Sequence, residues 1–70
     1  MDARRIERIA RDIISDFGFP AELVEVDPEE GVGWRVTLRA SGRLIYLAIT
    51  SDSTAVQVRE RLRERLEAEP

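Results

Sequence analysis

Apolar residues recur at helical spacing in the first segment of the chain, from Asp2 to Phe17. This periodicity predicts an amphipathic helix with one buried face. Asp2 is a good N-cap, and Gly18 followed by Phe19 and Pro20 is typical of a Schellman ending. The predicted buried stripe consists of Ile6, Ile9, Ala10, Ile13, Ile14 and Phe17.

The same spacing returns near the end of the chain and predicts a second helix from about Thr54 to Ala68. Its start, SDST at 51–54, contains groups that can bind an anion at a helix N-terminus. Asp52 already brings a negative charge there, and Thr54 with Gln57 fits a capping box. We therefore interpret this stretch as a helix start without a ligand. The predicted buried stripe consists of Ala55, Val58, Leu62 and Leu66.

Three runs between the helices have the alternation typical of strands: Glu22 to Asp27, Trp34 to Ala40, and Arg43 to Thr50. A two-residue turn at Ser41-Gly42 fixes the register of the last two runs. It places Trp34 opposite Ile49, Val36 opposite Leu47 and Leu38 opposite Ile45, so the strong core candidates share one face. Across a 27–33 loop, the first two runs are predicted to pair Val26 with Trp34, Val24 with Val36, and Glu25 with Arg35.

These elements predict one domain over residues 1–70, an α+β two-layer fold in the order α-β-β-β-α. A three-stranded antiparallel meander carries both helices on one face, because only one face of the meander is consistently apolar. Trp34 is expected in the core, near Ile49 and Val24. The opposite face of the sheet should be open to solvent, with Leu23, Thr37, Leu44 and Tyr46 accessible.

Composition removes most catalytic chemistry. The 70 residues include no cysteine and no histidine, and all 11 basic residues are arginine. Thiolate nucleophiles, the commonest neutral-pH base and Schiff-base lysines are therefore missing. We expect no enzyme activity, no catalytic residue, no cofactor and no metal site.

The chain has no run of about 18 apolar residues that would span a bilayer. Its beginning, Met1 to Arg11, has the pattern of an amphipathic helix and not of a secretory signal. We therefore expect no membrane association and a cytoplasmic location.

Two charged stretches are candidates for ligand binding. The 27–33 loop, DPEEGVG, offers hard oxygen ligands for calcium, but it lacks the alternating ligands and final glutamate of an EF-hand. A solvated hairpin loop with Gly31 or Gly33 at positive φ fits better. Four arginines on the first helix, Arg4, Arg5, Arg8 and Arg11, could follow a phosphate backbone. Glu7 and Asp12 interleave with them and the net charge is −3, so we expect a solvated surface and no nucleic-acid binding.

The predicted αβββα order resembles the topology of double-stranded RNA-binding domains over nearly the whole chain. Those domains bind RNA through the first helix, a Gly-Pro-x-His loop and a lysine cluster at the last helix. Here the loop is acidic, without histidine, and the last helix opens with SDSTAVQ. The resemblance therefore implies the fold and not the function, and RNA binding is only a distant alternative.

Two functional hypotheses remain. Caps, turns, register and binary pattern agree with one fold, and with the missing residue types the chain resembles a de novo designed, monomeric scaffold without activity. Arg4 and Arg5 near a helix start, and Glu67 and Glu69 near a helix end, oppose the helix dipole that a designer would respect. The alternative is a natural bacterial interaction or homodimerisation module. Its candidate partner surface is the open sheet face with Leu23, Thr37, Leu44 and Tyr46.

Overall fold

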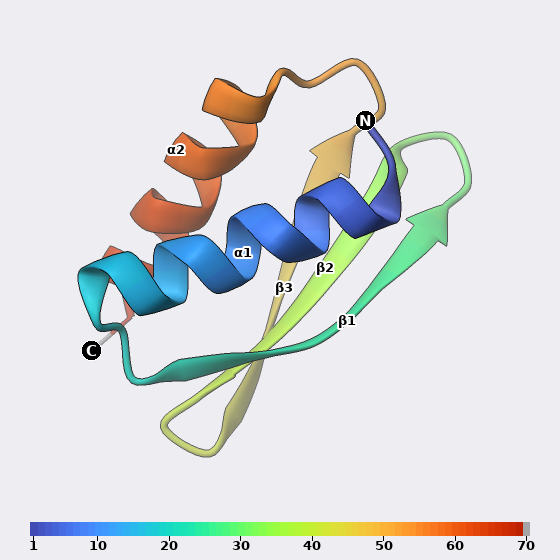
Figure 1. The fold of residues 1–70 in the computed structure, drawn as a ribbon. Coiled ribbons are helices and arrows are strands. Elements are labelled where there is room, and N and C mark those ends of the chain that lie inside the picture. Colours follow the sequence, from blue (N-terminus) through green and yellow to red (C-terminus); the bar gives the residue numbers. More distant parts are fainter. Residues whose placement is uncertain (70) are drawn as a thin grey trace.

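The computed structural model describes residues 1–69 and confirms the predicted α+β architecture (Figure 1). The three strands form an antiparallel sheet in the order β1-β2-β3. In the view of Figure 1, α1 crosses in front of the strands, and α2 lies beside α1. Neither helix in this part of the chain is long and apolar enough to cross a membrane. The elements are α1 Ala3–Phe17, β1 Ala21–Glu29, β2 Gly33–Ala40, β3 Arg43–Thr50 and α2 Ala55–Glu67.

The hairpin of β2 and β3 has the predicted register. Trp34 lies opposite Ile49 and Val36 opposite Leu47, and the pairing closes with Ala40 opposite Arg43. The turn residues Ser41 and Gly42 have φ of 54° and 75°, as a type I′ turn requires. This turn matches the right-handed twist of the strands, so it aligns the two apolar faces without a bulge.

The predicted register between β1 and β2 is wrong by two residues. Val26 pairs with Val36, where Trp34 was expected, and Glu25 pairs with Thr37. The pairing also shifts between Leu23 and Glu25, so Val24 forms a β-bulge. The bulge changes which side chains face inward, because one extra residue reverses the alternation on one side of it. Leu23 and Val26 consequently both pack against the core.

This register also shortens the hairpin loop. Strand β1 continues through Asp27 and Pro28 to Glu29, which pairs with Gly33. The Val32 N–H donates to the Glu29 carbonyl at 3.1 Å, and Gly31 takes a φ of 80°. The expected 27–33 loop is therefore reduced to residues 30–32.

Both helix starts and the end of α1 have the predicted caps. The Asp2 carboxylate accepts a hydrogen bond from the Arg5 N–H at 2.9 Å. At the end of α1, Gly18 has a φ of 65° and the Phe19 N–H donates to the Ile14 carbonyl at 3.1 Å, which is a Schellman bond. The Thr54 and Gln57 side chains each bond the other residue's backbone N–H in a capping box.

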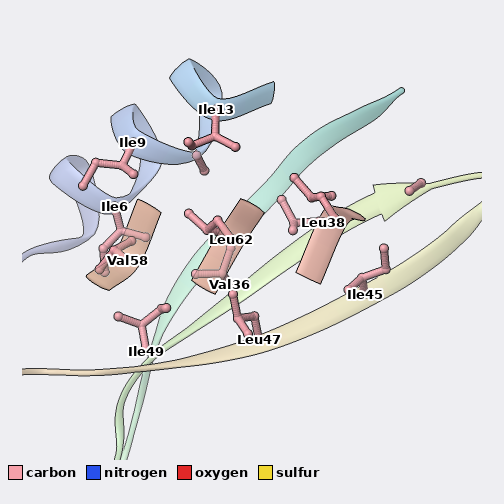
Figure 2. Packing of buried hydrophobic residues seen from close by; sticks show 13 residues of the cluster. Ile6, Ile9, Ile13, Val36, Leu38, Ile45, Leu47, Ile49, Val58 and Leu62 are labelled. Atoms are coloured by element: carbon pink, nitrogen blue, oxygen red, sulfur yellow. The ribbon is translucent and has the colours of Figure 1, made fainter. Parts of the chain in front are cut away.

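The core lies between the helices and one face of the sheet (Figure 2). Phe17 was expected there but is 52% exposed. It lies at the last position of α1, where its ring meets the ring of Phe19 with centroids 5.8 Å apart. The buried cluster consists of Ile6, Ile9, Ala10, Ile13, Val36, Leu38, Ala40, Ile45, Leu47, Ile49, Val58, Leu62 and Leu66.

Trp34 lies at the edge of this core and is half-buried. It lies opposite Ile49, as expected, but its neighbour on β1 is Pro28 and not Val24 or Val26. Its indole Nε1–H donates to the Met1 carbonyl at 3.0 Å. Trp34 thus joins the hairpin end of the sheet to the beginning of the chain.

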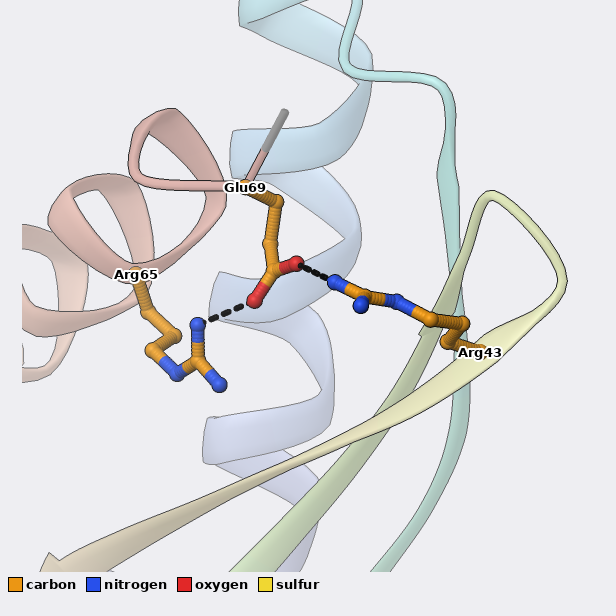
Figure 3. A network of polar contacts seen from close by, with 3 residues as sticks. All are labelled: Arg43, Arg65 and Glu69. Atoms are coloured by element: carbon orange, nitrogen blue, oxygen red, sulfur yellow. Dashed lines mark hydrogen bonds and ion pairs between the residues drawn. The ribbon is translucent and has the colours of Figure 1, made fainter.

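The end of α2 is joined to the β2–β3 hairpin by an ionic network (Figure 3). Glu69 accepts hydrogen bonds from Arg65, one turn earlier, and from Arg43 at the start of β3, the latter at 2.6 Å. Glu67 likewise lies 3.8 Å from Arg63. The two acidic residues that oppose the dipole of α2 are therefore each compensated by a nearby arginine.

Candidate interaction surface

The two helices cover one face of the sheet and leave the other face open. Charged residues of β1 and β2 face each other there. Arg39 bonds Glu22 at 2.6 Å, and Arg35 lies 4.0 Å from Asp27. These ion pairs are half exposed, so each adds little to stability and keeps this side of the sheet polar.

The prediction that four residues are accessible on the open face is wrong for two of them. Leu23 points to the helices, because the bulge at Val24 reverses its side of the strand. Thr37 is on the open face but only 3% exposed. It lies in the central strand between Glu25 and Tyr46, whose longer side chains flank it. The predicted surface of Leu23, Thr37, Leu44 and Tyr46 is therefore not one contiguous patch.

The accessible apolar surface on this side belongs mainly to β3. Leu44 is 48% and Tyr46 55% exposed, and Ala48 is exposed beside them. The Arg35 guanidinium lies 5.9 Å from the centroid of the Tyr46 ring, which is cation–π distance. Val24 on β1 is 41% exposed but is separated from these residues by the central strand.

The two edges of the sheet differ in how well they are protected against pairing with another chain. Strand β1 carries the bulge at Val24 and a proline at position 28, both of which block regular pairing. Glu25 and Asp27 add two carboxylates to this edge. A hydrogen bond with Asp27, and repulsion from its charge, raise the pKa of Glu25. A further strand would therefore meet an irregular and negatively charged edge.

Strand β3 has none of these protections. Its eight residues, Arg43–Thr50, pair with β2 without a bulge and contain no proline. Six consecutive apolar residues, LIYLAI at 44–49, form most of it. Its outer row of backbone N–H and C=O groups is therefore a regular template for a further strand. Sequence reasoning missed this difference, although Pro28 was a signal that β1 is an edge strand.

Within residues 1–69, no three carboxylates come together in a way that could hold a metal ion. A comparison with known protein families, with curated proteins and with solved structures finds no match to this chain. The β3 edge and the Leu44–Tyr46 surface are thus the features from which a function is inferred.

Proposed function

We propose that this protein is a non-catalytic interaction module that forms a homodimer by antiparallel pairing of β3 with β3 of a second copy. The observation that carries this proposal is the difference between the two sheet edges. Strand β1 is protected by a bulge, a proline and two carboxylates, whereas β3 is regular, apolar and free. Pairing of an exposed edge with another strand is a common mode of protein recognition.

The hairpin geometry defines the register of such a dimer. In a two-residue hairpin the closing pair, Ala40 and Arg43, is hydrogen-bonded, and bonding alternates along the strand. Leu44, Tyr46 and Ala48 therefore direct their N–H and C=O groups to the free edge. A two-fold axis at Tyr46 pairs this residue with Tyr46 of the second copy, and Leu44 with Ala48 of the second copy.

This register is favourable on both faces of the resulting six-stranded sheet. On the helix side, Ile45 lies opposite Leu47 of the second copy, so apolar residues face apolar residues. On the open side, the exposed Leu44 and Tyr46 surfaces of both copies meet at the axis. A second copy fits because the strand is self-complementary in this register, as an isologous interface requires.

The alternative function is that of a designed, monomeric scaffold without a partner. The agreement of caps, turns and binary pattern with the fold supports it. The two hypotheses differ in one observable, the mass of the protein in solution.

A charge-pair experiment at position 46 tests both the dimer and its register. Light scattering should show a dimer for the unchanged chain. Tyr46→Glu alone and Tyr46→Lys alone should each be monomeric, because like charges then face each other across the axis. An equimolar mixture of the two variants should regain the dimer mass, since opposite charges then meet.

Val24→Lys is the matched control, because Val24 is a similarly exposed apolar residue on the protected strand β1. It should leave the dimer intact. If Val24→Lys dissociates the dimer as well, the two copies pack through the whole open face and the edge-pairing proposal is wrong. A monomer at all concentrations up to about 1 mM, the range of weak interfaces, would refute the dimer and support the scaffold.

A further inference from the structure

Arginines without a carboxylate partner gather at the ends where both helices begin. Five of the 11 arginines form ion pairs within residues 1–69. Of the remaining arginines, for which no ion pair is found within these residues, four line one hollow of about 570 Å³. Asp2, Ile9 and Ala55 complete its lining. The first helix supplies Arg4, Arg5 and Arg8, and α2 supplies Arg59. The first-helix arginines were predicted to be a solvated surface, because Glu7 and Asp12 interleave with them and the net charge is −3. These side chains are indeed exposed, and the position of Arg59 beside them could not be read from the sequence.

This arrangement is electrostatically unfavourable when the hollow contains only water. Arg4 and Arg5 lie in the first turn of α1, which has no acidic residue there, so positive charges meet the positive end of the dipole. Arg8 is one turn from both, at spacings that place like charges side by side. At the C-terminal end of α2, by contrast, Arg43 and Arg65 compensate the negative charge of Glu69. Within residues 1–69, none of the four arginines of the hollow forms an ion pair with a carboxylate, so their guanidinium groups are open to an anion from solution.

We propose that this hollow binds a compact polyvalent phosphate anion, such as pyrophosphate or the phosphate chain of a nucleotide. Guanidinium groups bind phosphate oxygens through paired, charge-assisted hydrogen bonds. Two helix starts near the hollow, at Asp2 and Thr54, add partial positive charge. Asp2 is the one carboxylate in the lining, and one of its oxygens accepts the N-cap bond from Arg5.

The surroundings limit the size of the anion. The Trp34–Met1 hydrogen bond holds the β1–β2 hairpin at the same end of the molecule as the start of α1 (Figure 1). That hairpin carries Glu29 and Glu30, and the net charge of the chain is −3. A double-stranded RNA-binding domain contacts about 16 base pairs of duplex. A duplex of that length lying across the hollow would also meet these carboxylates. A ligand that fits inside the hollow avoids them.

Titration of the ¹⁵N-labelled chain with pyrophosphate at low salt tests this inference. Amide shifts should concentrate at the starts of α1 and α2. The double variant Arg8→Gln/Arg59→Gln should bind at least about tenfold more weakly, because each charged hydrogen bond contributes that much. The matched control, Arg11→Gln/Arg61→Gln, removes the same charge from the same helices outside the hollow. It should change the affinity less than about threefold, through long-range charge alone.

Two results would overturn the proposal. Equal weakening by both double variants would mean that pyrophosphate responds to overall charge and not to the hollow. Tighter binding of a 16-base-pair RNA duplex than of pyrophosphate, compared at the same salt concentration, would show an extended nucleic-acid surface instead of a compact site.

Discussion

At the scale of single residues, Thr37 is the clearest departure from a satisfied structure. Its side chain is 3% exposed, and within residues 1–69 its hydroxyl has no hydrogen-bond partner. Burial of an unpaired hydroxyl costs roughly 1–3 kcal/mol of stability.

Replacement of Thr37 by valine should therefore raise the free energy of unfolding by about 1 kcal/mol. Urea denaturation measures this change, provided that the variant and the unchanged chain have the same oligomeric state. Thr37→Ser is the control, since it keeps the hydroxyl and loses the methyl group. Serine should destabilise the fold. A valine variant that is less stable than the unchanged chain would show that the hydroxyl has a partner in solution.

At the scale of elements, Gly33 permits the close approach of two strands. It has a φ of 138°, and a Cβ built there would lie 2.5 Å from the Ser51 nitrogen and 2.7 Å from the Ile49 carbonyl oxygen. Both are backbone atoms at the end of β3, so no side-chain movement can relieve the overlap. Gly31, in the same hairpin, has a φ of 80° but nothing within 4 Å of its Cβ position.

These two glycines provide a matched pair of substitutions. Gly31→Ala should cost about 1–2 kcal/mol of stability, the penalty for a side chain at left-handed φ. Gly33→Ala should cost about 3 kcal/mol or more, because overlap with the β3 backbone adds to that penalty. Thermal unfolding followed by circular dichroism measures both. Equal costs would mean that β2 and β3 separate easily at this end.

At the scale of the whole molecule, Glu69 holds α2 to the β2–β3 hairpin. Hydrogen bonds from Arg65 and then Arg43 hold the pKa of Glu69 below its ordinary value of 4.5. The folded state therefore favours the ionised carboxylate. The stability that Glu69 contributes is present above the ordinary pKa and is lost as the pH falls through the lowered pKa.

Glu69→Gln should consequently destabilise the protein at pH 7, and the difference from the unchanged chain should shrink as the pH falls below 4.5, the ordinary pKa of the carboxyl group. Urea denaturation at several pH values measures this difference. Glu25 acts in the opposite direction, because its raised pKa means that its ionisation costs stability at neutral pH. Glu64→Gln is the control, since Glu64 belongs to no ion pair within residues 1–69. A Glu69→Gln difference that does not change with pH would contradict the ionic role.

The sequence by itself determined the features that depend on near neighbours. Caps at Asp2, Gly18 and Thr54 bond residues within five positions, and the Ser41-Gly42 turn sets the β2–β3 register through its own φ angles. The amphipathic stripes likewise reveal which face of each helix is buried. Element order and the two-layer architecture follow from these local signals, because the apolar faces have only one way to cover each other.

Only the tertiary structure decided the register of β1 and the two surfaces for which functions are proposed. Leu23, Val24 and Val26 are apolar at both parities, so alternation cannot distinguish a regular strand from a bulged one. Packing against the helices favours the bulged strand, because a bulge at Val24 lets Leu23 and Val26 both contact the core. The bulge makes the β1 edge irregular, whereas β3 pairs with β2 without a bulge. The arginine hollow likewise depends on packing, since Arg59 is more than 50 residues from Arg8 in the sequence and shares the hollow only because the two helices pack together.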